Sequence, residues 1–189
     1  MRYLLFLTAF FLLADCCGLN AQDARQYSFT HYGASAGLTS NEARAVLHDR
    51  DGYVWIGTNN GLLRYDGARF TSLRHDKDNP LSLPHNFVIQ LLTDINGRIW
   101  VLCGDNKVAI LNPRRMEFTP VPVRFKRPSS RMAIKKLVKD EYGNVMLIAA
   151  RSELLTWNAE RGDMSSDYNF IPLPNDVEPV DICQQPGER

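Results

Sequence analysis

The feature that most constrains this fold is one segment that occurs three times at almost equal spacing. Each copy has an aspartate, two variable residues and a glycine, followed by apolar residues, as in Asp49–Thr58. The three glycines are Gly52, Gly97 and Gly143, so neighbouring copies are separated by 45 and 46 residues. A fixed period of this length is the sequence signature of a repeat architecture.

Each period predicts four short strands joined by tight turns. Glycine accepts positive φ without steric cost and aspartate hydrogen-bonds its own backbone nearby, so the Asp-x-x-Gly segment favours a turn between two strands. The run Val54–Ile56 suits a buried pleated surface, and further strands follow at 62–67 and 70–73. Four strands in each period of about 45 residues are typical of a β-propeller blade. We therefore expect an all-β fold of four-stranded antiparallel blades, with structural repeat positions at Gly52, Trp55, Gly97, Trp100 and Gly143.

Alignment of the periods predicts where the blades begin and end. A strand at 27–32 precedes the first blade and is expected to close the ring by joining the last blade. In the third period, Phe170–Ile171 aligns with Phe70 and Phe118 and is predicted to be the fourth strand. Because a propeller needs at least about four blades, we expect the chain to be the N-terminal part of a larger ring. The predicted blades are 43–73, 87–121 and 133–173, and the next blade starts at 179–189.

The first 21 residues, 1–21, have the pattern of a secretory signal peptide. Arg2 is followed by an apolar stretch from Leu4 to Ala14 that is too short to span a membrane, and small residues precede a cleavage point after Ala21. A lipoprotein signal ending at Cys16 is the alternative, which Asp15 disfavours. We expect an exported chain whose mature part, 22–189, is a partial propeller.

The cysteines are predicted to be structural. Cleavage of the signal would remove Cys16 and Cys17 and leave Cys103 and Cys183, which are too few for a disulfide framework. Their repeat positions fall on different strands of distant units, so we predict two small buried hydrophobic side chains. No Cys/His spacing indicates a metal site.

Composition and motif spacing disfavour several functions. The formal net charge is +1, so there is no electrostatic reason to expect nucleic acid or an anionic surface as a partner. The four histidines lie apart without carboxylates at catalytic spacing, and the turn at Asp49–Gly52 lacks the further oxygen ligands of a calcium loop. We therefore predict no catalytic residue, metal or cofactor in this segment, and core positions for the repeated tryptophans.

Three segments resemble the two-component regulator propeller repeat: Gly37–Asn41, Asp49–Thr58 and Asn60–Gly67. The first period fits the pattern closely. The second has Leu102 and Cys103 in place of the Gly-Thr pair, and the third has Met146 in place of the tryptophan. The resemblance extends from about Tyr27 to the end of the chain.

The resemblance implies a sensor function. Such repeats form large periplasmic propellers, often two rings of seven blades, ahead of a Y-Y-Y domain, a membrane helix and a histidine kinase or other output module. Many of these proteins are dimeric sensors of carbohydrate fragments in Bacteroidetes. We therefore expect the N-terminal part of a periplasmic, ligand-sensing propeller, non-enzymatic in itself, whose partner is an oligosaccharide or another small ligand. The alternatives are a streptogramin lyase-like enzyme, which Asn106–Pro113 also resembles, and a scaffold or adhesion propeller.

We predict ligand-binding residues on one rim of the ring. In a propeller the first-to-second-strand turns share a rim, and here these Asp-x-x-Gly turns already have a structural explanation. The opposite rim carries the connections between blades and the second-to-third-strand turns, which vary between periods and offer polar groups. The predicted ligand-binding residues are Asn41, Asn59, Asn86 and Arg131.

Overall fold

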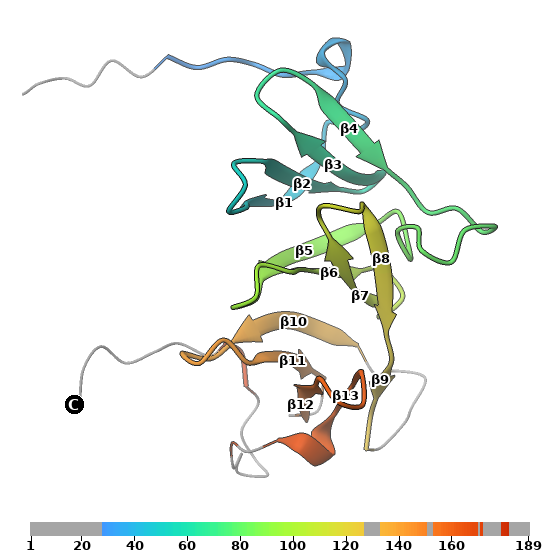
Figure 1. Cartoon of the computed structure of the whole chain (residues 1–189), viewed down its shortest axis with the longest axis vertical. Helices are drawn as coiled ribbons and strands as arrows, with labels where there is room; N and C mark the ends of the chain where they lie inside the picture. Colours follow the sequence, from blue (N-terminus) through green and yellow to red (C-terminus); the bar gives the residue numbers. More distant parts are fainter. Residues whose placement is uncertain (1–27, 127–132, 151–152, 170, 172–178, 182–189) are drawn as a thin grey trace, which may run out of the picture. The chain divides into compact units, whose positions relative to one another are not determined.

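The fold consists of three antiparallel sheets that follow one another along the chain (Figure 1). The computed structural model describes residues 28–126, 133–150, 153–169, 171 and 179–181. The chain divides into two units, Met1–His31 and Tyr32–Arg189. Residues 28–31, the described part of the first unit, form neither helix nor strand, and the predicted signal peptide lies outside the described residues.

Each sheet of the second unit is one blade in which strands pair in sequence order, which confirms the predicted fold class. Blade 1 contains β1 (Ala43–His48), β2 (Val54–Thr58), β3 (Gly61–Tyr65) and β4 (Phe70–Leu73). Blade 2 contains β5 (Val88–Thr93), β6 (Ile99–Cys103), β7 (Val108–Asn112) and β8 (Glu117–Val121). Blade 3 contains β10 (Ile134–Lys139), β11 (Val145–Ala149), β12 (Glu153–Asn158) and β13 (Asp163–Ser165).

A short strand and two 3-10 helices complete the elements among the described residues. Strand β9 (Val123–Arg124) pairs in parallel with β13, so the connection from blade 2 adds a fifth strand to the edge of blade 3. The helices are η1 (Ala34–Ala36) and η2 (Ser166–Tyr168). No helix in this part of the chain is long and apolar enough to cross a membrane.

The sequence repeat produces the same backbone geometry in all three blades. In each blade the pairing of the first strand with the second shifts register, between residues 43 and 45, 88 and 90, and 134 and 136. These shifts recur at the spacing of the repeated glycines, whose φ angles of 89°, 77° and 82° are in the left-handed region. Because residues with a Cβ rarely adopt that region, glycine is the residue that this turn requires.

The core lies between the sheets. The side chains of β6 alternate: Ile99 and Val101 pack in a cluster with Trp55 of blade 1, whereas Trp100 and Leu102 pack with residues of blade 3. All five residues of β6 are therefore buried. This is why the apolar runs of the sequence do not alternate with polar residues: blade 2 is covered on both faces.

Gly57 is needed where blades 1 and 2 approach closely. A Cβ at this position would lie 2.6 Å from Cγ1 of Val88 on β5, closer than non-bonded carbon atoms come. At the corresponding position of blade 2, Leu102 fits into the core shared with blade 3. The Gly-Thr pair of the first period thus reflects local packing between two particular blades.

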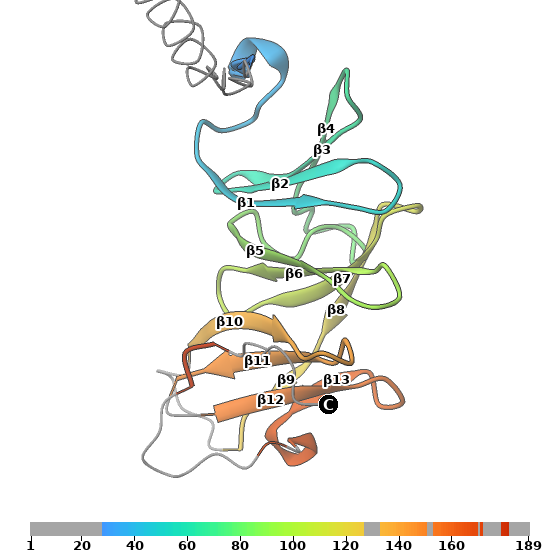
Figure 2. The same ribbon diagram turned by 90° about the vertical axis from the view of Figure 1, so that its left-hand side faces the viewer.

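The first strands of the blades lie next to one another, as Figure 2 shows for β1, β5 and β10. Gln90 on β5 connects two of them: its Oε1 accepts a hydrogen bond from the Leu137 amide (2.7 Å) and its Nε2 donates to the Leu137 carbonyl (2.8 Å). Lys136 has the same repeat position as Gln90 and pairs with Asp181. Asp181 belongs to the segment predicted to start the next blade.

The prediction for the fourth strand of blade 3 was wrong. The strand is Asp163–Ser165, whereas Phe170 lies outside the described residues and Ile171 belongs to a bend. The Asn158 side chain accepts hydrogen bonds from the Glu160 and Arg161 amides, and this short turn returns the chain to the sheet earlier than predicted.

The stretch predicted as a closing strand also differs. Ser28 to Tyr32 is not a strand, and the last blade with which it was expected to pair is not among the described residues. Tyr32 instead packs on blade 1, where its hydroxyl lies 2.9 Å from that of Tyr65 and its ring contacts Phe70 edge-on.

Candidate functional site

The repeated aspartate of blade 1 organises the turn between β1 and β2. Oδ1 of Asp49 accepts hydrogen bonds from the Asp51 and Tyr53 amides, at 3.0 and 2.9 Å. Its Oδ2 accepts one from Nε1 of Trp55 at 2.6 Å. The aspartate, the turn and the tryptophan of the repeat are therefore one hydrogen-bonded unit, and both carboxylate oxygens face N–H donors.

Blade 2 repeats this unit and adds a cation. Asp94 accepts hydrogen bonds from the Asn96 and Arg98 amides and, through Oδ2, from Trp100 Nε1 at 3.0 Å and Arg98 Nε at 2.7 Å. Burial alone would raise the pKa of the Asp94 carboxyl. The hydrogen bonds from Trp100 and Arg98 outweigh burial, so the pKa is lowered below its ordinary value.

Blade 3 holds its aspartate differently because Met146 replaces the tryptophan. Asp140 accepts a hydrogen bond from the Asn144 amide at 2.8 Å, and its Oδ2 accepts one from Asn144 Nδ2 at 2.6 Å. Asn144, a residue of the turn, thus supplies the side-chain hydrogen-bond donor that the second strand of this blade lacks. Among the described residues no group of three or more His, Cys, Asp or Glu side chains is arranged to hold a metal ion.

These turns define two rims. The turn rim carries the first-to-second-strand and third-to-fourth-strand turns of each blade, because antiparallel strands alternate in direction. The opposite rim carries the second-to-third-strand turns and the connections between blades. Asn41, Asn59 and Asn86, three of the predicted ligand-binding residues, belong to the opposite rim.

The structure gives two of the four predicted ligand-binding residues local hydrogen bonds. Asn59 Oδ1 accepts from Ser40 Oγ at 2.6 Å, and its Nδ2 donates to Glu42 Oε2 at 3.1 Å. Asn86 Oδ1 accepts from the His75 amide at 2.8 Å, and its carbonyl accepts from the Gly61 amide at 2.7 Å. These contacts bring Asn59 and Asn86 to one region between blades 1 and 2. Asn41 is exposed and lies in sequence between Ser40 and Glu42, the two residues that contact Asn59. Arg131 lies outside the described residues.

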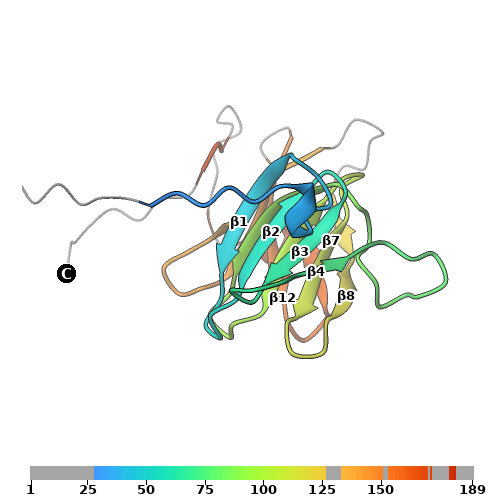
Figure 3. The ribbon, with the colours of Figure 1, turned by 90° about the horizontal axis from the view of Figure 1, so that it is seen from above.

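A hollow opens near Asn86, between blades 2 and 3 and the long β4–β5 connection. Figure 3 shows this connection extending beyond the sheets. Its volume is about 630 Å³, and we call it the loop hollow. Residues of the connection from His75 to Pro84, of the turn at 106–108 and of the segment 120–125 line it. The sequence identified this connection only as a variable stretch, so the hollow was missed.

The connection that forms the loop hollow is internally braced. His75 Nδ1 is 2.8 Å from the Leu83 carbonyl, and Ser82 Oγ accepts from the Asp76 amide and donates to its carbonyl, both at 2.9 Å. Leu83 is fully buried in the core between blades 1 and 2. The wall of the hollow is therefore formed before any ligand binds.

Cys103 is the last residue of β6 and its side chain lies in the core. It is a buried free thiol in the core cluster of blade 2, as predicted, and burial raises its pKa to about 12. At that pKa the thiol stays protonated and is a poor nucleophile or metal ligand near neutral pH. Cys183 lies outside the described residues.

Comparison with known proteins bears directly on the repeats. Residues 37–60 and 82–105 match the family model named two component regulator propeller. These two segments of the chain match that repeat. The first segment ends at the β2–β3 turn and the second at the β6–β7 turn, and each begins in the connection before the first strand of its blade. Leu83 in the second segment corresponds to Leu38 in the first. The second matched segment therefore includes Leu83, the buried anchor of the β4–β5 connection.

Two similar solved structures share the fold of these regulator propeller repeats. They are the extracellular domains of proteins named as hybrid two component systems, BT3049 and BT4673, from B. thetaiotaomicron. The first has a TM-score of 0.60 and 16% identity over 71% of this chain and 19% of that one. The second has a TM-score of 0.53 and 20% identity over 66% of this chain and 16% of that one. The chain thus spans less than a fifth of each.

A third structure, virginiamycin B lyase from Staphylococcus aureus, is 15% identical over 65% of this chain and 39% of that one. Its TM-score of 0.47 carries no argument for lyase chemistry here. No curated protein matches the chain.

Proposed function

We propose that this chain is part of the ligand-sensing propeller of a two-component sensor outside the cytoplasm. The observation that carries the proposal is the pair of regulator propeller repeats at 37–60 and 82–105, each seated in a propeller blade. The similar structures are extracellular domains of hybrid two component systems, and the sequence pattern of 1–21 favours export to the periplasm. Further blades, a Y-Y-Y domain, a dimeric state and an output kinase belong to the same proposal for the full sensor.

The loop hollow is the proposed site for a neutral oligosaccharide or a similar small ligand. Sugars present hydroxyl groups around apolar ring faces, and the hollow offers both kinds of surface. Pro80, Pro120 and Phe125 provide apolar walls, and Asn79 and Lys107 provide polar groups. A volume of about 630 Å³ is within the range of small-molecule sites, which is roughly 300–1,000 Å³.

The position of the hollow suits a sensor because its walls belong to three blades. The β4–β5 connection leaves blade 1, the turn at 106–108 belongs to blade 2, and Val123 lies on β9 in the sheet of blade 3. A ligand shifts a conformational equilibrium only by its difference in affinity between two states. A ligand that contacts all three walls would favour the state in which the walls have the right spacing.

Calorimetric titration with a panel of neutral gluco-, xylo-, manno- and arabino-oligosaccharides tests this proposal. We expect one class to bind and Lys107→Ala to weaken its binding. Lys139→Ala is the matched control, because both lysines are exposed and donate to a backbone carbonyl, Pro84 for Lys107 and Thr93 for Lys139. Equal binding by the two variants would contradict the site, and a full sensor that answers none of these sugars would contradict the ligand class.

A further inference from the structure

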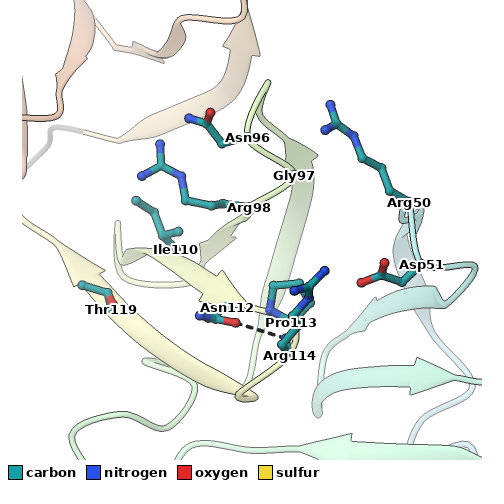
Figure 4. A pocket seen from close by; sticks show the side chains of 10 residues that line it. All are labelled: Arg50, Asp51, Asn96, Gly97, Arg98, Ile110, Asn112, Pro113, Arg114 and Thr119. Atoms are coloured by element: carbon teal, nitrogen blue, oxygen red, sulfur yellow. Dashed lines mark hydrogen bonds between the residues drawn. The ribbon is translucent and has the colours of Figure 1, made fainter.

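A second hollow, of about 580 Å³, lies on the turn rim over the turns of blade 2, beside the β1–β2 turn of blade 1 (Figure 4). The turns at 50–51, 96–98 and 112–114 line it, together with Ile110 and Thr119 from β7 and β8. A smaller hollow of about 310 Å³ shares Asp51, Pro113 and Arg114 with it and adds Tyr53 and Arg64. We call the two together the arginine groove.

Four guanidinium groups come from different elements to this groove. Arg50 Nη2 donates to the Ile95 carbonyl at 3.0 Å and Arg98 Nε donates to Asp94, so each keeps further N–H groups for a ligand. The Arg114 side chain has no hydrogen bond or ion pair with any described residue. Arg64 lies over the Tyr53 ring, 4.5 Å from its centroid. Its Nε is buried and has no partner among the described residues.

Three carboxylates lie at or beside these four cations. Asp49 is buried and accepts hydrogen bonds from the Asp51 and Tyr53 amides and from Trp55. Asp94 is buried and already accepts hydrogen bonds from Trp100 and Arg98. Asp51 is exposed and lines both hollows. The groove therefore keeps an excess of positive charge although the whole chain is almost neutral. Beside the arginines it offers groups that hydrogen-bond hydroxyls, on Asp51, Asn96, Asn112 and Thr119.

The fold itself does not require these arginines, as the next pair of blades shows. The repeat positions of Arg50, Arg98 and Arg114 are occupied there by Ile95, Asn144 and Glu160. Those blades pack against each other through the same strands without the cationic side chains. The charge is a property of one junction between blades and needs an explanation other than blade packing.

We propose that the arginine groove binds an oxyanion, a carboxylate or a sulfate, carried on a small polyhydroxylated molecule. Guanidinium groups match both oxyanions in shape and charge and form bidentate hydrogen bonds with them. Asp51, Asn96 and Asn112 would form hydrogen bonds with the hydroxyl groups. This site lies on the turn rim and is independent of the neutral-ligand site proposed for the loop hollow.

Calorimetric titration of the purified protein with D-glucuronate, D-glucose and inorganic sulfate tests the groove. We expect glucuronate to bind at low ionic strength, glucose not to bind, and sulfate to compete with glucuronate. Arg114→Gln should weaken glucuronate binding about tenfold or more, on the scale of one charge-assisted hydrogen bond. Raising the salt concentration should weaken it further, because the groove is open to solvent.

Arg115→Gln is the matched control, since it removes the same charge from the neighbouring residue, which pairs with Glu117 outside the groove. It should change the affinity less than twofold, and both variants should keep the melting temperature of the parent. Equal weakening by both variants would show general charge attraction and overturn the site. Binding of glucose as strong as that of glucuronate, or no binding of glucuronate, would overturn anion recognition. Sulfate that binds without displacing glucuronate would assign the two to different places and overturn the shared site.

Discussion

Blades 1 and 2 hold their repeated aspartate in one way and blade 3 in another, although the backbone turns are the same. In the first two blades a tryptophan of the second strand donates to the carboxylate from the core side. In blade 3 Met146 takes that position, and the donor is Asn144 within the turn. The aspartate is correspondingly buried in blades 1 and 2 and half-buried in blade 3.

This difference shows which part of the repeat is obligatory. The left-handed glycine and the aspartate that accepts backbone amides occur in all three turns, whereas the side-chain donor to the second carboxylate oxygen changes. A buried acceptor without a donor costs about 1–3 kcal/mol, so a donor has to come from somewhere. The repeat therefore conserves a satisfied carboxylate and leaves open which residue satisfies it.

The largest effect is expected at Trp100. Trp100→Ala should lower the free energy of unfolding by about 3–5 kcal/mol, the usual cost of removing a buried aromatic ring. The ring is fully buried, packs edge-on against Trp157 and donates to Asp94. Urea denaturation followed by circular dichroism measures this loss.

A conservative pair of changes separates the lost donor from the lost ring. Trp100→Phe keeps an aromatic ring and removes the N–H, whereas Met146→Leu keeps volume and removes no donor. We expect the first to cost clearly more than the second, which should cost less than about 1.5 kcal/mol. Equal losses would mean that the hydrogen bond to the aspartate is not what distinguishes the blades.

The next largest effect is the contribution of Asp94 to the free energy of unfolding, which depends on pH. The pKa of Asp94 is lowered in the folded state, so its stabilising contribution is present above the ordinary value of 3.8 and is lost as the pH falls through the folded-state pKa. Asp94→Asn should be less stable than the parent at neutral pH, by roughly 1.5–3 kcal/mol for hydrogen bonds to a charged group. The difference should shrink below pH 3.8 in urea melts recorded across the acid range. A difference independent of pH would assign the loss to packing.

The sequence predicted those parts of the fold that depend on local chemistry. Asp-x-x-Gly turns and apolar runs act over a few residues, so the strands of blades 1 and 2 could be placed from the chain alone. The fourth strand of blade 3 was misplaced because the prediction followed the aromatic residue Phe170 and not the length of the turn after the third strand. Met164 pairs with Trp157 as Phe118 pairs with Leu111, and counting residues from Asn158 and Asn112 would have found it.

The candidate sites were harder to predict because they depend on packing between blades. Asn59 and Asn86 were predicted from polar groups of the variable turns and connections on one rim, yet both make hydrogen bonds within that rim. The arginine groove joins residues of two blades that are far apart in sequence, such as Arg50 and Arg114, so no local motif marks it. The net charge of +1 is a sum over the whole chain, so it does not reveal the local excess of positive charge in the groove.

The smallest effect is expected in blade 3, where the aspartate is half-buried. Asn144→Ala removes the 2.6 Å hydrogen bond to Asp140 Oδ2 but keeps the Asn144 amide bond. Because water can reach the carboxylate there, the loss should be about 0.5–1.5 kcal/mol, below that of Asp94→Asn. Urea denaturation of Asn144→Ala, Asp140→Ala and the double variant forms a thermodynamic cycle.

The cycle decides whether Asn144 replaces the missing tryptophan. If it does, the double variant should lose less than the sum of the two single losses, because both single changes break the same bond. Arg98→Ala with Asp94→Ala is the matching cycle in blade 2, where Trp100 still donates to the carboxylate. We expect a smaller coupling in blade 3, since Asn144 is uncharged and water reaches the Asp140 carboxylate, whereas Arg98 forms an ion pair with the buried Asp94. Additive losses in blade 3 would show that Asp140 is satisfied by water, and that the side-chain donor is dispensable in this blade.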